Sequence, residues 1–158
     1  MTIHYAMKVK MQFSTGGAIT IRDRNLVKKI PHLVSFIARH YPNWEETNVR
    51  MSEPLFVPFP YDAGVFLLEY VTEYVPPNKR EGITTLMHYQ EADSKTLVEL
   101  KTLQSLAEYL QCFDFRDCIL FVRNQYFGET RIPRAFVEDY MSGRLSHIIQ
   151  PWPLPLQP

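Results

Sequence analysis

The alternation of apolar and polar residues near the N-terminus predicts a β-hairpin. From Ile3 to Phe13, apolar side chains recur at every second position, which is the pattern of a strand buried on one face. The run at 14–17 is Ser-Thr-Gly-Gly, a composition that favours a tight turn, and a second strand-like run begins at Ala18. We therefore expect residues 3–22 to form two paired strands.

Helical spacing and prolines shape the next part of the chain. Apolar positions within 25–40 predict a helix that Pro31 either interrupts or opens as its first-turn residue. A short strand is expected at 55–57, where two nearby prolines cut it off. Residues 62–75 predict the most deeply buried helix of the chain, because their polar positions form one narrow stripe. Asp62 is expected to cap this helix.

The second half of the chain is predicted to be mainly helical. An amphipathic helix is expected to start after a cap at Ser94 and to run to Leu110. Residues 113–126 predict either another helix or a helix followed by a strand. Pro133 is expected to open one more short helix, whereas the tail at 151–158 is rich in proline and typical of extended polyproline structure.

Together these elements predict an α+β fold, in which a small mixed sheet packs on the buried central helix and a helical C-terminal half covers it. A chain of 158 residues is long enough for one domain with a real core. We expect that domain over residues 1–150, divided into a segment at 3–76 and a mainly helical extension at 77–150. No apolar run is long enough to span a membrane, so no membrane partner is expected.

Charge is unevenly distributed, although the formal net charge is zero. Residues 1–44 carry an excess of +6, and residues 45–158 carry the opposite excess. Neutralisation within one fold, an anionic partner and an organelle-targeting segment are three explanations, and the strand-like period argues against the last. A nucleic-acid partner is not expected, because no patch of mixed basic and aromatic residues stands out.

The cysteines and histidines give no sign of a metal or a cofactor, and none is expected. Cys112 and Cys118 lack the Cys-x-x-Cys spacing of zinc ligands and are too few for a disulfide framework. Both are expected to be reduced and buried, which favours an intracellular protein.

The segment at 62–66, Asp-Ala-Gly-Val-Phe, resembles the Asp-Cys-Gly-Val-Phe box of the ubiquitin-like-protein (SUMO) protease family of cysteine peptidases. In that family a His starts a strand, an Asp ends the next strand, and the nucleophilic Cys opens the central helix. Here His4 starts the first predicted strand, and Asp23 ends the second one, 19 residues later. Ala63 stands where the resemblance implies the cysteine, and Val57 stands where it implies an oxyanion-binding Gln.

With these substitutions the resemblance implies a catalytically inactive relative, a truncated and degenerate pseudo-peptidase. A methyl group at Ala63 cannot be a nucleophile, and Val57 has no donor for an oxyanion. His4 and Asp23 would be vestigial, although capping of the next helix is an equal explanation for Asp23. The alternative is an active SUMO-specific or ubiquitin-like-specific cysteine peptidase with an engineered Cys-to-Ala change, which would explain Ala63 but not Val57.

The expected function is therefore protein–protein interaction. The family has a substantial segment before the His, and this chain starts three residues before it, so apolar surface would be open for a partner or a second copy. A ubiquitin-like modifier is one partner that the resemblance implies, and a plant source or a selfish or toxin-like role is compatible with it. The expected compartment is the cytoplasm or nucleus, with mitochondria as the alternative.

Overall fold

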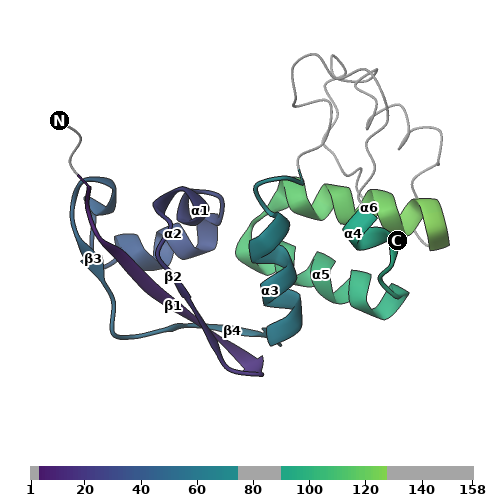
Figure 1. The fold of residues 1–158 in the computed structure, drawn as a ribbon, viewed down its shortest axis with the longest axis horizontal. Helices are drawn as coiled ribbons and strands as arrows, with labels where there is room; N and C mark the ends of the chain where they lie inside the picture. Colours follow the sequence, from purple (N-terminus) through teal and green to yellow (C-terminus); the bar gives the residue numbers. More distant parts are fainter. Residues whose placement is uncertain (1–3, 75–89, 128–158) are drawn as a thin grey trace, which may run out of the picture. The chain divides into compact units, whose positions relative to one another are not determined.

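The computed structural model describes residues 4–74 and 90–127. Where the sequence predicts one domain over 1–150, the Cα positions separate into two compact units (Figure 1). The first unit is Met1–Thr72 together with Leu106–Cys112, and the described residues of the second are 73–74, 90–105 and 113–127. The predicted helix at Pro133 and the tail at 151–158 lie outside the described residues.

The first unit contains a mixed sheet of four strands. β1 (Met7–Thr15) pairs antiparallel with β2 (Ala18–Ile21), which confirms the predicted hairpin. On its other side, β1 pairs in parallel first with β3 (Val49–Arg50) and farther along with β4 (Leu55–Pro60). The predicted α+β class with a small mixed sheet is therefore confirmed.

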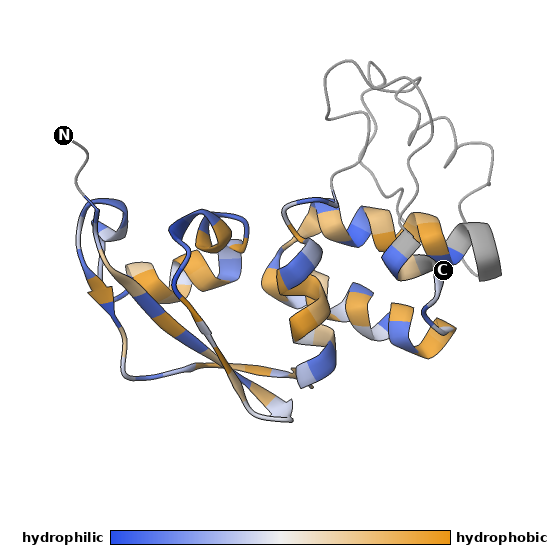
Figure 2. Ribbon diagram, in the orientation of Figure 1, coloured by the Kyte–Doolittle hydropathy of each residue, from blue (hydrophilic) through white to orange (hydrophobic). Residues whose placement is uncertain are grey.

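Alternate residues of β1 point into the core, as the sequence predicts. The buried set on this strand is Met7, Val9, Met11 and Phe13. Hydrophobic and hydrophilic residues alternate visibly along β1 in Figure 2. The helices α1 (Arg24–Lys28) and α2 (Pro31–Ala38) lie beside the sheet in Figure 1 and contribute the fully buried side chains of Val27, Leu33 and Ile37. The inner face of the sheet is therefore the core of the first unit.

Pro31 opens α2 and does not interrupt a longer helix. It occupies the first helical turn, where its missing N–H leaves no hydrogen bond unmade. The carboxylate of Asp23 caps α1 by accepting a hydrogen bond from the backbone N–H of Asn25 at 2.9 Å. The predicted helix over 25–40 is thus two short helices, the second of which begins at the proline.

β4 continues through the two prolines that were expected to cut it off. The carbonyl of Phe56 accepts a hydrogen bond from the hydroxyl of Tyr109 at 3.3 Å, so the backbone groups of this residue face the outer edge of the sheet. Pro58 lies two residues farther along the same edge, where a strand needs no N–H for pairing. The prediction of a strand end at Pro58 is therefore wrong, because β4 is an edge strand.

The helix of the Asp-Ala-Gly box is α3 (Tyr61–Tyr70). Its N-cap is Pro60 and no side chain caps it, so the predicted cap at Asp62 is wrong and this carboxylate lies in the first turn. α3 meets the sheet at the end of β1, where a Cβ on Gly64 would lie 2.2 Å from Cζ of Phe13. α1 packs against β2, and α3 packs against β1 and β4.

The second unit is built from helices, with α4 (Gln90–Asp93), the start of α5 (Leu97–Leu110) and α6 (Phe113–Phe127). Both long helices were predicted, and α6 continues as a helix with no strand after it in the described residues. Every position from 117 to 122 in α6 is buried. Among the described helices, α6 and not α3 therefore has the longest run of buried residues.

The N-terminus of α5 is capped two residues after the predicted Ser94. The backbone N–H of Thr96 donates to Oε1 of Glu99 at 3.0 Å, and the backbone N–H of Glu99 donates to Oγ1 of Thr96 at 3.2 Å. This reciprocal pair is a capping box. The hydroxyl of Ser94 instead donates to the carbonyl of Glu91 at 3.3 Å, so the predicted cap at Ser94 is wrong.

Candidate interaction surface

The residues of the predicted catalytic set lie at opposite ends of β1. The register of β1 with β2 places Asp23 just beyond the start of β1, which is the end where His4 lies. Ala63 lies in the first turn of α3, and the start of that helix lies against Gly16, in the turn beyond the other end of β1. β1 has nine residues, a length on the order of 25 Å. The structure therefore does not bring Ala63 together with His4 or Asp23.

Each of these residues has a local environment that accounts for it without catalysis. His4 is exposed, and Asp23 caps α1. Val57 is 1% exposed in β4 and belongs to the core, so it does not face a substrate. Ala63 is half-buried in α3.

Arg24 is a structural residue that the sequence does not reveal. Its guanidinium donates to the backbone carbonyls of Tyr5 at 3.2 Å, Ala6 at 3.1 Å and Thr47 at 3.1 Å, and also to that of Trp44. The same group lies 5.9 Å from the ring centroid of Trp44. Arg24 thus joins the segment before β1 to the segment before β3, and no motif in the sequence signals this arrangement.

A pocket of about 380 Å³ lies between the end of α2 and the segment that follows β3. Its lining residues are His40, Tyr41, Arg50, Met51, Ser52 and Glu53. The hydroxyl of Tyr41 donates to the carbonyl of Arg50 at 3.0 Å, which ties the two walls together. The lining carries charges of both signs and includes none of the predicted catalytic residues, so its geometry does not indicate a reaction.

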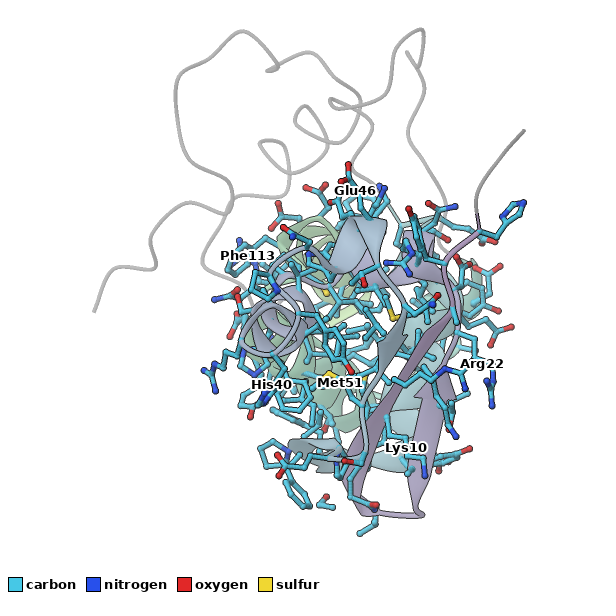
Figure 3. All side chains as sticks on the ribbon, turned by 90° about the vertical axis from the view of Figure 1, so that its left-hand side faces the viewer. Lys10, Arg22, His40, Glu46, Met51 and Phe113 are labelled. Atoms are coloured by element: carbon cyan, nitrogen blue, oxygen red, sulfur yellow. The ribbon has the colours of Figure 1, made fainter. Side chains whose placement is uncertain are left out.

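The outer face of the sheet carries a row of basic side chains, which we call the basic row: Lys8, Lys10, Arg22 and Arg50. Lys8 pairs with Arg50 of β3, and Arg22 directly follows β2, whose last residue, Ile21, pairs with Val9 next to Lys8. Lys10 follows on the same face and pairs with Thr20. Lys10, Arg22 and Arg50 are exposed, and Lys8 is half-buried. Figure 3 shows the side chains of Lys10 and Arg22 beside the strands of the sheet.

No ion pair is seen between a carboxylate and the basic row in the described part of the chain. The four strands contain Lys8, Lys10 and Arg50 but no Asp or Glu. Two ion pairs of the described residues, Lys95 with Glu99 and Arg116 with Asp117, lie outside this face. Like charges that lie directly opposite on neighbouring strands destabilise a sheet. The basic row therefore costs stability in the isolated chain, and nothing on the described strands offsets that cost.

Phe56 adds an apolar group to the same outer face. It pairs with Gln12 in the register of β1 and β4, two positions beyond Lys10, and its side chain is 69% exposed. Phe56 therefore gives this face an exposed aromatic ring close to the exposed cations of the basic row. The sequence indicates that Lys8 and Lys10 lie on a solvated face, but only the register reveals that Arg22, Arg50 and Phe56 share it.

Comparisons with known proteins give no assignment: no family model matches the chain, and no curated protein matches it. Within residues 4–74 and 90–127, no helix combines the length and apolarity needed to cross a membrane. The same residues contain no group of three or more His, Cys, Asp or Glu side chains placed to hold a metal ion. Cys112 and Cys118 are buried and form no disulfide, as predicted.

Proposed function

We propose that this chain acts as a binding protein that contacts another protein through the outer face of its sheet. The observation that carries the proposal is the basic row together with Phe56, a surface with unpaired cations and an exposed aromatic ring on one face. Aromatic residues and Arg are enriched at protein interfaces, and exposed charges guide a partner of opposite charge to the surface.

In this proposal no peptidase chemistry takes place at position 63. A nucleophile and its base must lie within hydrogen-bonding reach of each other. Ala63 and His4 are separated by the length of β1, so a cysteine at position 63 would not have His4 as its base. The resemblance of the box to a SUMO-protease motif is thus compatible with a chain that retains the local sequence without the catalytic geometry.

A site-specific photo-crosslinker tests the proposed function. Benzoylphenylalanine is placed at Thr20, which is exposed on the outer face next to Lys10, and separately at Ser35, which is exposed on α2. We expect a discrete protein adduct in native lysate from position 20 and none from position 35. The captured protein is then purified and its binding to the chain measured by calorimetry. Equal adducts from both positions, or no direct binding, would contradict the proposal.

A further inference from the structure

We infer that the outer face of the sheet binds an extended, acidic segment of a partner protein, with carboxylates on the basic row and a large apolar side chain against Phe56. This inference rests on the proposed function and adds the chemistry of the partner. It is carried by the geometry of the face, by the charge of the whole chain, and by the state of the β4 edge.

The distance between the basic row and Phe56 determines how far apart the acidic and apolar residues of the ligand must be. Lys8 and Arg50 lie on neighbouring strands, and Arg22 directly follows the third strand, β2, so the Cα atoms of the three residues span about 10 Å. Phe56 lies opposite Gln12, about 13 Å along the sheet from Lys8. An extended chain covers that distance in about four residues. The ligand is therefore a segment in which acidic residues stand about four positions from a large apolar residue.

The charge of the chain favours an acidic protein over a nucleic acid. The net charge is zero and the pI is about 7.0, so the chain as a whole has no excess charge to attract a polyanion over long range. Nucleic-acid-binding domains are typically strongly basic and stack several bases on aromatic side chains. Among the described strands, Phe56 is the one exposed large aromatic residue on this face, so the face has no series of rings on which several bases could stack.

The outer edge of β4 lacks the free backbone groups that an added strand would need. The ligand is therefore expected to contact the face through its side chains. Addition of a strand at that edge would require free backbone groups. The carbonyl of Phe56 already accepts the hydroxyl of Tyr109, and Pro58 and Pro60 have no N–H to donate. Recognition therefore comes from the basic row and the aromatic ring, not from a new backbone ladder at β4.

Fluorescence anisotropy with a defined probe tests the inference. The probe is a fluorescein-labelled synthetic peptide in which a run of glutamates is followed, after an alanine spacer, by a phenylalanine; a second peptide has glutamine in place of glutamate. We expect the glutamate peptide to bind the full chain, with an affinity that falls as salt is added, and the glutamine peptide not to bind.

Two double variants supply the matched comparison, since each changes the net charge equally. Lys10→Glu with Arg22→Glu neutralises the basic row, because Lys8 and Arg50 remain, whereas Lys28→Glu with Arg39→Glu changes exposed cations in α1 and at the C-cap of α2. We expect the first pair to weaken peptide binding by about tenfold and the second to leave it unchanged. Phe56→Ser should also weaken binding, and unfolding in urea confirms that each variant remains folded.

Several outcomes would overturn the inference. They are absence of peptide binding, equal loss in both double variants, or tighter binding of a fluorescein-labelled oligothymidylate, which would indicate a nucleic acid. A crosslinked partner that still binds the Lys10→Glu/Arg22→Glu variant, or an adduct with a second copy of the chain, would also overturn it while leaving the proposed protein–protein function in place. If no partner is captured from position 20 either, both proposals fail.

Discussion

The glycine of the box that resembles a peptidase motif, Gly64, is explained by its close packing against the sheet. A Cβ at this position would lie 2.2 Å from Cζ and 2.3 Å from Cε1 of Phe13, a ring that is 4% exposed in the core. Glycine is the residue without a Cβ, so it allows α3 to approach the end of β1 this closely. The glycine of the box is thus required by the contact between α3 and the sheet.

Whether Gly64→Ala raises or lowers the free energy of unfolding tests that explanation. In an open helical position, Gly64→Ala would stabilise the protein by about 1 kcal/mol through better helix propensity. Here we expect it to lower the free energy of unfolding by about 1–3 kcal/mol, because the added methyl group overpacks the contact with Phe13. Urea denaturation measures the change, and the double variant with Phe13→Leu should recover part of the loss. A stabilised Gly64→Ala protein would contradict the packing explanation.

Burial also determines the chemistry of Cys112. Desolvation raises the pKa of its thiol from 9.0 to about 12, because the buried side chain stabilises the neutral form over the thiolate. Its Sγ lies 3.5 Å from the carbonyl oxygen of Lys29, which further disfavours a negative charge there. This cysteine is therefore inert in the folded state, in agreement with the sequence-based expectation of a buried thiol.

The raised pKa predicts a loss of stability in alkali. Below pH 9 the thiol is protonated in both the folded and the unfolded chain, so its ionisation does not lower the free energy of unfolding there. Between pH 9 and about 12 the unfolded chain loses the proton and the folded one does not, so stability falls as pH rises, by about 1.4 kcal/mol per pH unit at most. Urea unfolding at pH 8 and pH 10 should show a smaller decrease for Cys112→Ala than for the unchanged chain; equal decreases would contradict this assignment.

At the scale of elements, hydrophobic spacing locates most helices and strands, but the residues that end them depend on local hydrogen bonds. The hairpin of β1 and β2, the helices α5 and α6, and Pro31 as the start of α2 follow from period and proline position. Ser94 and Thr96 both have a hydroxyl that suits a helix cap. Thr96 caps the helix because Glu99, three residues later, completes a capping box with it. This signal is present in the sequence.

The two hydroxyl residues before α5 therefore differ in a measurable way. We expect Thr96→Ala to lower the free energy of unfolding by about 1 kcal/mol, since it removes the acceptor for the N–H of Glu99. Ser94→Ala serves as the control and should change stability by less than about 0.5 kcal/mol. The pKa of Glu99 is lowered, chiefly by the backbone hydrogen bond from Thr96, so the contribution of the cap is present above pH 4.5 and declines as pH falls below it. A larger loss in Ser94→Ala than in Thr96→Ala would contradict this assignment.

At the scale of the whole molecule, the arrangement of α3 relative to β1 within the first unit bears on the resemblance to a peptidase. Order along the chain is the same as in that family, with His, Asp and the box in sequence. Strand pairing decides where those residues lie in space, and β4 runs parallel to β1 before α3 begins. α3 consequently starts at the end of β1 that is far from His4.

A single substitution tests this arrangement. We expect Ala63→Cys to remain unlabelled by a ubiquitin-like vinyl-sulfone probe and to hydrolyse no ubiquitin-like precursor, because His4 is on the order of 25 Å away along β1. Mass spectrometry of the intact protein detects labelling, and denaturation followed by iodoacetamide verifies that the new thiol is present. Covalent labelling of the folded variant would show that position 63 and His4 do come together, and would support the peptidase interpretation.

Sequence alone determined the alternation of β1, the hairpin, the helices α5 and α6 and the burial of the cysteines, because each depends on residues close together in the chain. It did not determine which residues share the outer face of the sheet. Lys8 and Arg50 are 42 positions apart, and only the parallel pairing of β1 with β3 sets them side by side. The basic row and the separation of Ala63 from His4 follow from strand order and register, which local periodicity does not encode.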